Sequence, residues 1–141
     1  MWICQECKRV FEKDKQPHSC KSTSFGDHFI KRGKAKEIFD SLLREINGKI
    51  GKCQIISLPC CIHLFGKYDF LAVLPRKDRL EIRFALDRAL DSSRLKKSVP
   101  LSLRDIKNCI DVREVTEIDR ELIGWLKEAY HLRERVAKEI H

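Results

Sequence analysis

The stretch YDFLAVLPRKDRLEIRFAL, residues 68–86, indicates the fold class most clearly because it contains two β-strand patterns joined by a short polar turn. From 68 to 74, apolar side chains fall on both faces of an extended chain, which is typical of a central strand covered on both sides. From 79 to 86, apolar and charged side chains alternate, so one face of this strand should lie in the core and the other in solvent. Pro75 and Asp78 bound the turn between the two runs. The stretch therefore predicts an antiparallel hairpin inside a sheet.

Further strand patterns flank this hairpin. Residues 53–58 (CQIISL) and 61–65 (CIHLF) are β-rich runs separated by Pro59, and 106–115 (IKNCIDVREV) is a candidate for one more strand. Residues 92–105 have no regular period, and we expect them to be irregular. The short connections favour a small antiparallel sheet of four to five strands.

Two amphipathic helices complete the pattern. The apolar side chains of residues 34–47 share one sector of a helix, and Gly48 stands where that helix should end. Thr116 and Asp119 have capping spacing ahead of a C-terminal helix. The apolar stripe of that helix consists of Leu122, Ile123, Trp125, Leu126, Ala129 and Tyr130, continued by Val136, Ala137 and Ile140.

Arg133 falls within this stripe. Either the helix leaves the core near Leu132, or Arg133 extends to solvent or forms an ion pair. The whole pattern predicts an α+β domain over residues 22–141, in which an N-terminal and a C-terminal helix pack on the sheet.

The N-terminal segment, residues 1–21, is too polar to fold by burying apolar surface and contains a metal-ligand pattern that we call the knuckle. Its candidate ligands are Cys4, Cys7, His18 and Cys20, a Cys-x-x-Cys pair followed by His-x-Cys. Three thiolates and an imidazole are a common closed zinc set, and four protein ligands leave no position for a reacting water, so we expect the zinc to be structural. Trp2 and Phe11 are the apolar residues expected to pack the knuckle on the domain. The alternatives are a reduced Cys-x-x-Cys with an unrelated His and Cys, or a redox pair, which lacks the usual strand-then-helix setting.

The charge of the chain is unevenly distributed. Residues 1–97 carry 21 Lys or Arg against 12 Asp or Glu, a net of +9, whereas residues 98–141 carry 8 against 9. A positive surface of this kind attracts phosphate. The candidate nucleic-acid contacts are Lys8, Arg9, Arg32, Lys34, Arg76, Lys77, Arg79 and Arg83. The alternative is a solvated face on which Asp78 and Glu81 pair with the neighbouring arginines.

The seven cysteines fit a reducing compartment. The chain shows no export signal and no apolar run long enough to cross a bilayer, so we expect a cytoplasmic protein without a membrane partner. Cys60 and Cys61 read as small buried residues on opposite faces of a strand, with an additional metal site that includes His63 as the lesser alternative. Cys53 and Cys109 read as core or half-buried.

Tyr68, Trp125 and Tyr130 are candidates for a ligand pocket or a base-stacking surface, although aromatic residues at helical spacing are more often core. None of the usual phosphate-binding, dinucleotide, zinc-protease or nucleophile-elbow motifs is present. Asp69 with Glu81-x-Arg83 is similar to the Asp…Glu-x-Lys pattern of metal-dependent nucleases, but an Arg cannot readily release a proton as a Lys can.

The order of these motifs resembles that of an uncharacterised bacterial family, domain of unknown function 5655. The resemblance is carried by W-x-C-x-x-C-x-x-x-F, by Q-x-H-S-C and by the closing D-R-E-L-I-G-W-L-K-E-A-Y. It implies a small α+β domain, and some relatives are attached to nuclease-like or DNA-related modules, but it implies no reaction. Gln5 stands where a Pro is expected, and the stretch between Lys96 and Lys107 is longer than expected.

Taken together, the sequence predicts a zinc-stabilised, small cytoplasmic binding module that contacts DNA or RNA through a basic surface. The first alternative is an accessory domain that binds a protein or a small ligand, with a pocket between the sheet and the C-terminal helix. A metal-dependent nuclease that uses Asp69 and Glu81 is the more remote alternative. The oligomeric state does not follow from the residues.

Overall fold

The computed structural model describes residues 2–18, 20 and 24–140. The elements of these residues are, in chain order, β1 (Trp2–Ile3), β2 (Val10–Phe11), a 3₁₀ helix (Phe25–Phe29), α1 (Gly33–Lys49), β3 (Gln54–Ser57), β4 (Ile62–Phe65), β5 (Asp69–Pro75), β6 (Leu80–Leu86), β7 (Leu95–Ser102), β8 (Asp105–Val112), a second 3₁₀ helix (Val115–Glu117) and α2 (Arg120–Ile140).

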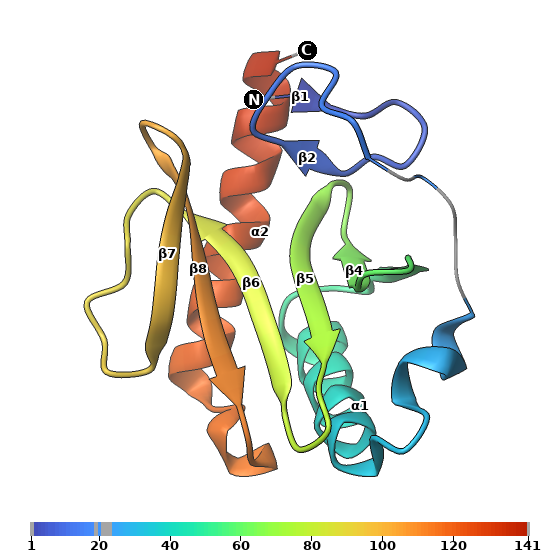
Figure 1. Ribbon diagram of the computed structural model, residues 1–141. Coiled ribbons are helices and arrows are strands. Elements are labelled where there is room, and N and C mark those ends of the chain that lie inside the picture. The colour runs from blue at the N-terminus through green and yellow to red at the C-terminus, as the bar shows by residue number, and fades with distance from the viewer. Residues whose placement is uncertain (1, 19, 21–23, 141) are drawn as a thin grey trace.

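The hairpin of residues 68–86 lies at the centre of the sheet, as the sequence predicts. Among the described residues, β3 to β8 form one antiparallel sheet of six strands in the order β3-β4-β5-β6-β8-β7. β5 and β6 pair from Pro75 opposite Leu80 to Ala72 opposite Arg83. β1 and β2 form a separate two-stranded sheet in the knuckle, which lies at the end of the large sheet where β5 begins (Figure 1).

α1 and α2 pack on the same face of the large sheet (Figure 1). One register row that faces them runs across four strands as Ile62, Val73, Ile82 and Ile110, and all four side chains are buried. The apolar stripes of both helices close this layer, and their buried members include Ile38, Phe39, Leu42, Ile46, Leu122 and Leu126. The predicted α+β class, with two helices packed on an antiparallel sheet, is thereby confirmed.

The opposite side of the large sheet, which we call the open face, carries the next register row. Because side chains alternate along a strand, His63, Ala72, Arg83 and Cys109 point away from the helices. In the part of the chain that the structure describes, neither helix covers this face (Figure 1). The open face is therefore the side on which a site can form beside the knuckle.

Two expectations about the elements were wrong. Residues 92–105, expected to be irregular, contain β7, which brings the sheet to six strands among the described residues instead of four to five. β7 is an edge strand whose residues are mostly exposed, so its backbone pairing with β8 leaves little trace in the apolar pattern. Gly48 lies inside α1 and does not end it, since the N–H of Ile50 still donates to the carbonyl of Ile46.

Arg133 is buried and forms an ion pair. This is one of the three alternatives that the sequence allowed for a charged residue within the apolar stripe of α2. Nη1 of Arg133 lies 2.8 Å from Oδ2 of Asp105 on β8, and both side chains are buried. At the start of α2, Asp119 is itself the cap, because its Oδ1 accepts a hydrogen bond from the N–H of Leu122. Thr116, the other residue of the predicted capping pair, lies in the second 3₁₀ helix instead. The stripe residues Val136, Ala137 and Ile140 lie outside the described side chains.

Within the described residues, no helix is both long enough and apolar enough to cross a membrane.

Candidate functional site

The knuckle turn holds Cys4 and Cys7 close together. The N–H of Lys8 donates to the carbonyl of Cys4 at 2.8 Å, and the N–H of Cys4 donates to the carbonyl of Arg9 at 3.0 Å. Lys8 adopts a left-handed backbone conformation with φ of 63°, which closes the turn between β1 and β2. These contacts fix the two sulfurs on one side of the turn.

The four predicted ligands meet, with Sγ of Cys4, Cys7 and Cys20 and a ring nitrogen of His18 all within 4.8 Å of one another. Sγ of Cys20 lies 3.8 Å from Sγ of Cys4 and 3.1 Å from Nε2 of His18, and Sγ of Cys7 lies 3.4 Å from the same nitrogen. A tetrahedral ion with metal–sulfur bonds of about 2.3 Å and a metal–nitrogen bond of about 2.0 Å places its ligands about 3.5 to 3.8 Å apart. The cluster therefore could hold one metal ion.

His18 is oriented for this role by its other ring nitrogen. Nδ1 lies 2.7 Å from the carbonyl oxygen of Gln16, to which it donates when Nε2 is unprotonated and faces the sulfurs. The imidazole stacks on Phe11, with ring centroids 4.1 Å apart, and meets the edge of Trp2 at 5.9 Å. The two aromatic residues of the knuckle thus pack around a candidate ligand.

The thiols of the cluster differ in acidity. The backbone N–H of Cys7 lowers the pKa of Cys4 to about 6 against the opposing effect of burial. Burial, followed by the neighbouring Cys4 and Cys7, raises the pKa of Cys20 to about 12. A bound cation stabilises all three thiolates together, so that their negative charges no longer destabilise one another.

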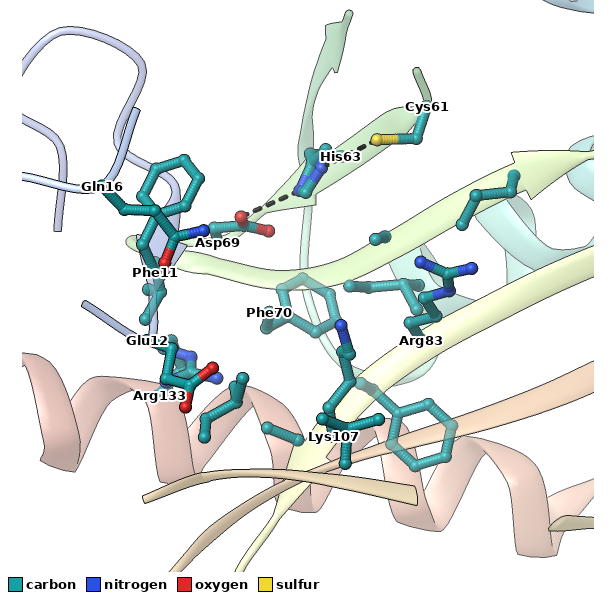
Figure 2. A pocket seen from close by; sticks show the side chains of 18 residues that line it. Phe11, Glu12, Gln16, Cys61, His63, Asp69, Phe70, Arg83, Lys107 and Arg133 are labelled. Carbon is teal, nitrogen blue, oxygen red and sulfur yellow. Dashed lines mark hydrogen bonds and ion pairs between the residues drawn. The ribbon is translucent and has the colours of Figure 1, made fainter. Parts of the chain in front are cut away.

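A cavity of about 330 Å³ lies on the open face, beneath the knuckle. Residues of the knuckle and of the sheet line it together with Arg133 of α2, and those of the knuckle and sheet include Phe11, Gln16, His63, Phe70, Arg83 and Lys107 (Figure 2). Its walls combine aromatic rings with cationic groups and with the carboxylates of Glu12 and Asp69. No local sequence pattern indicates this cavity, because segments far apart in the chain form it.

A chain of polar contacts runs along one wall of the cavity. Nε2 of His63 lies 3.2 Å from Sγ of Cys61, and Nδ1 of His63 lies 2.8 Å from Oδ2 of Asp69 (Figure 2). The side chains of His63 and Asp69 are only 12% and 9% exposed. Burial, reinforced by contact with Cys60, raises the pKa of Cys61 to about 12.

The prediction for the adjacent cysteines needs correction. Both precede β4 in the turn after β3, where Leu58 and Cys61 exchange two backbone hydrogen bonds around Pro59 and Cys60. Cys60 is exposed, not buried, and its sulfur lies 2.7 Å from that of Cys61, so the pair does not point to opposite faces of a strand. Pro59 was the available signal, because Pro is favoured at the second position of a β-turn. Cys53 is half-buried and Cys109 is buried, as expected.

Several of the predicted basic contacts on β6 and its turn pair with acidic groups. Glu81 accepts hydrogen bonds from Arg83 at 2.8 Å, from Lys96 at 3.2 Å and from Arg76 at 3.4 Å. Burial opposes the ionisation of Glu81, but the bonds from Arg83 and Lys96 outweigh it and lower its pKa to about 2. Arg79 pairs with Asp78 at 2.9 Å and with Asp111 at 3.4 Å. These are the pairings expected for a solvated face, although three cations still surround the single carboxylate of Glu81.

The other predicted basic residues are spread over the molecule. Lys8 is exposed on the knuckle, and Lys77 is exposed in the β5–β6 turn at the far end of β5. Arg9 is buried, with Nε 3.4 Å from Sγ of Cys7. Arg32 donates to the carbonyls of His28 and Pro75, and Lys34 pairs with Glu114 at 2.8 Å. Of the predicted basic residues, Arg83 lines the cavity. It does so together with Lys107, a residue that the sequence did not single out.

Tyr68, Trp125 and Tyr130 do not line the cavity beneath the knuckle. Tyr130 packs edge-on against Phe70, with centroids 5.2 Å apart. The ring of Trp125 lies 5.5 Å from the guanidinium of Arg94, and Tyr68 is half-buried beside Lys67. Each of these rings therefore contacts a different part of the molecule.

Asp69 and Glu81, the carboxylates of the nuclease alternative, are kept apart by the sheet. Glu81 pairs with Leu74, five residues along β5 from Asp69. At about 3.3 Å per residue this is on the order of 17 Å, too far for a shared metal ion. We searched the described residues for groups of three or more His, Cys, Asp or Glu side chains that lie close enough together to hold a metal. The knuckle cluster is such a group, and Asp69 and Glu81 belong to none among the described residues.

Comparison with known proteins gives one match. A family model described as Domain of unknown function (DUF5655) matches residues 25–133. The knuckle precedes this range. No curated protein matches the chain, and no solved structure matches it.

Proposed function

The chain belongs to the family described as Domain of unknown function (DUF5655), and we propose that it is a zinc-stabilised module that binds single-stranded nucleic acid on the open face of its sheet. Zinc organises the knuckle, and the knuckle completes a cavity in which a base and its phosphates are bound.

Zinc is the metal that best suits the knuckle cluster. Three thiols and one imidazole are borderline-soft ligands that favour zinc over magnesium or calcium, which prefer oxygen. Four protein ligands leave no open coordination position, so the ion is structural. Zinc binding to segments of this kind contributes on the order of 10–16 kcal/mol at neutral pH, which is ample for a segment with so little apolar surface.

The observation that carries the nucleic-acid proposal is the composition of the cavity wall. Phe11 and Phe70 offer aromatic surface, while Arg83 and Lys107 supply positive charge beside it. Proteins that bind single strands combine stacking rings with a positive groove in the same way. Within the described contacts, Lys107 has no acidic partner, so its ammonium is available to a phosphate.

Arg83 also fits this role although it contacts Glu81. Arg76, Arg83 and Lys96 share Glu81, so these four groups carry an excess of positive charge. A phosphate that approaches Arg83 meets this excess and can bind without displacing the carboxylate. Phosphate contacts of this type give affinity without sequence recognition.

Fluorescence anisotropy with labelled single-stranded DNA and RNA tests the proposal. We expect binding that weakens as salt rises, and we expect Arg83→Gln or Lys107→Gln to weaken it. Lys127→Gln removes an exposed charge from α2, on the helical side of the molecule, and should leave the affinity unchanged. Absence of binding at about 50 mM salt would refute the proposal.

A small anionic ligand is the second candidate, because the cavity volume lies within the range of small-molecule sites. The same assay distinguishes the two. A mononucleotide that competes fully with the oligonucleotide at similar concentration favours the small ligand. Competition only by longer strands favours nucleic acid.

A further inference from the structure

The turn before β4 places two thiols in contact but in different surroundings. Cys60 is exposed at the apex of the turn, whereas Cys61 is only 6% exposed. Their sulfurs are 2.7 Å apart. A reagent from solvent therefore meets Cys60 first, and the thiol that lies behind it is Cys61.

The buried thiol is paired with a base. Nε2 of His63 lies 3.2 Å from Sγ of Cys61, and Nδ1 lies 2.8 Å from Asp69. When Nδ1–H donates to the carboxylate, Nε2 is left free to accept the proton of the Cys61 thiol. The positive charge of Arg9 interacts with both cysteines.

We propose that Cys60 and Cys61 are a redox-active dithiol that exchanges with disulfides, with Cys60 as the attacking thiol, Cys61 as the resolving thiol and His63 as its base. This activity is chemically distinct from nucleic-acid binding, although Cys61, His63 and Asp69 line the same cavity. It uses a pair of cysteines and a His–Asp pair to which the proposed function assigns no role.

The exchange has two steps. Cys60, as the thiolate, attacks one sulfur of a disulfide R–S–S–R′, so that a Cys60–S–S–R bond forms and R′–S⁻ leaves with the electron pair of the broken bond. His63 then takes the proton of Cys61, whose thiolate attacks the sulfur of Cys60. The Cys60–Cys61 disulfide forms, and R–S⁻ leaves and is protonated by His63. The dithiol loses two electrons, and the substrate disulfide is reduced to two thiols.

The oxidised pair should be easily reduced again. Consecutive Cα atoms are about 3.8 Å apart across a trans peptide, whereas disulfides usually span about 4.4 to 6.8 Å. A disulfide between neighbours in the chain is therefore strained, and strained, exposed disulfides are the reducible ones. The geometry suits a disulfide that forms and breaks in a cycle better than a structural crosslink.

The probe for this inference is 5,5′-dithiobis(2-nitrobenzoate), a disulfide whose released thiolate is coloured. The reduced, zinc-loaded protein should release two thiolates in a fast phase, and peptide mapping should find a Cys60–Cys61 disulfide. Cys61→Ser should release one thiolate and retain the probe on Cys60. Cys60→Ser should lose the fast phase, while the matched control Cys53→Ser should keep it.

His63→Gln separates the role of a base from a role in folding. We expect the first thiolate to be released at the normal rate and the second about 100-fold more slowly, the lower end of what a positioned base contributes. Raising the pH should restore part of the second phase, because hydroxide replaces the missing base.

Two results would overturn the inference. One is a wild-type protein in which no Cys60–Cys61 disulfide is found after exposure to the probe, a measurement that needs no variant to fold. The other is a Cys60 that reacts no faster than Cys53. A second release that is unchanged in His63→Gln would remove His63 from the mechanism.

Discussion

Glu81 controls the charge of the open face at the scale of single residues. Its carboxylate lies at the centre of Arg76, Arg83 and Lys96, and the side chain is 4% exposed. Those bonds lower its pKa from 4.5 to about 2, despite burial. The charged form is therefore more stable in the folded protein than in the unfolded chain.

This depressed pKa predicts a loss of stability in acid. The contribution of Glu81 is fully present above about pH 4.5 and disappears as the pH falls towards 2, with a magnitude of up to about 3 kcal/mol. Urea unfolding at neutral and acidic pH measures it. Glu81→Gln should lose less stability on acidification than the wild type. Equal losses in the two proteins would contradict the cause assigned to the shift.

Single residues also show what the sequence could and could not reveal about the site. The meeting of Cys4, Cys7, His18 and Cys20 was predictable, because a Cys-x-x-Cys pair followed by a nearby His and Cys is a metal-ligand pattern. The contact of His63 with Asp69 was not. It depends on an irregularity in the β4–β5 register near Phe65, and no local pattern specifies that shift.

At the scale of elements, the connection between β4 and β5 is fixed by its contact with α2. A Cβ added to Gly66 would lie 2.0 Å from Cε2 of Tyr130 and 2.6 Å from its Cζ. Tyr130 in turn packs on Phe70 at the start of β5. Glycine at position 66 therefore lets α2 approach the sheet.

Gly66→Ala is predicted to destabilise the protein by about 1–3 kcal/mol, the usual range for overpacking. Chemical denaturation measures this change. The double variant Gly66→Ala/Tyr130→Leu should recover part of the loss relative to Tyr130→Leu alone, because the clashing ring is gone. Fully additive effects would mean that the two residues do not compete for the same space.

Elements with a buried apolar face were predictable, and those held mainly by backbone pairing were not. The β5–β6 hairpin and the two helices each present an apolar face, and such a face appears in the sequence as apolar residues at regular spacing. β7 has no such face, because it lies at the edge of the sheet with exposed lysines at 96 and 97. Gly48 likewise did not end α1, since tertiary packing of the helix outweighs the cost of about 1 kcal/mol for a glycine in its interior.

At the level of the whole molecule, the knuckle meets the large sheet at the cavity. The apolar core lies between the sheet and the helices, whereas the knuckle contains the Cys/His cluster. The cavity requires both, because Phe11 and Gln16 of the knuckle line it together with residues of the sheet (Figure 2). The sequence predicted each unit but not the site between them.

Removal of the metal should unfold the knuckle and leave the α+β domain folded. In a Trp125→Phe variant, Trp2 is the remaining tryptophan, and it contacts the ring of His18. A strong chelator should shift the fluorescence of Trp2 to that of an exposed indole while the far-ultraviolet dichroism changes little. Restoring zinc should reverse the shift. Loss of helical dichroism on chelation, or an unchanged Trp2 spectrum, would contradict this division.

The salt dependence of single-strand binding is the sharpest test of whether nucleic acid binds on the open face. The measurement compares the wild type with Arg83→Gln/Lys107→Gln by anisotropy over a series of salt concentrations. If each cation neutralises one phosphate, the slope of log Kd against log salt should fall by about 1.4 in the double variant, because each contact to a single strand contributes about 0.7. The same affinity and the same slope in both proteins would place the nucleic acid elsewhere or exclude it.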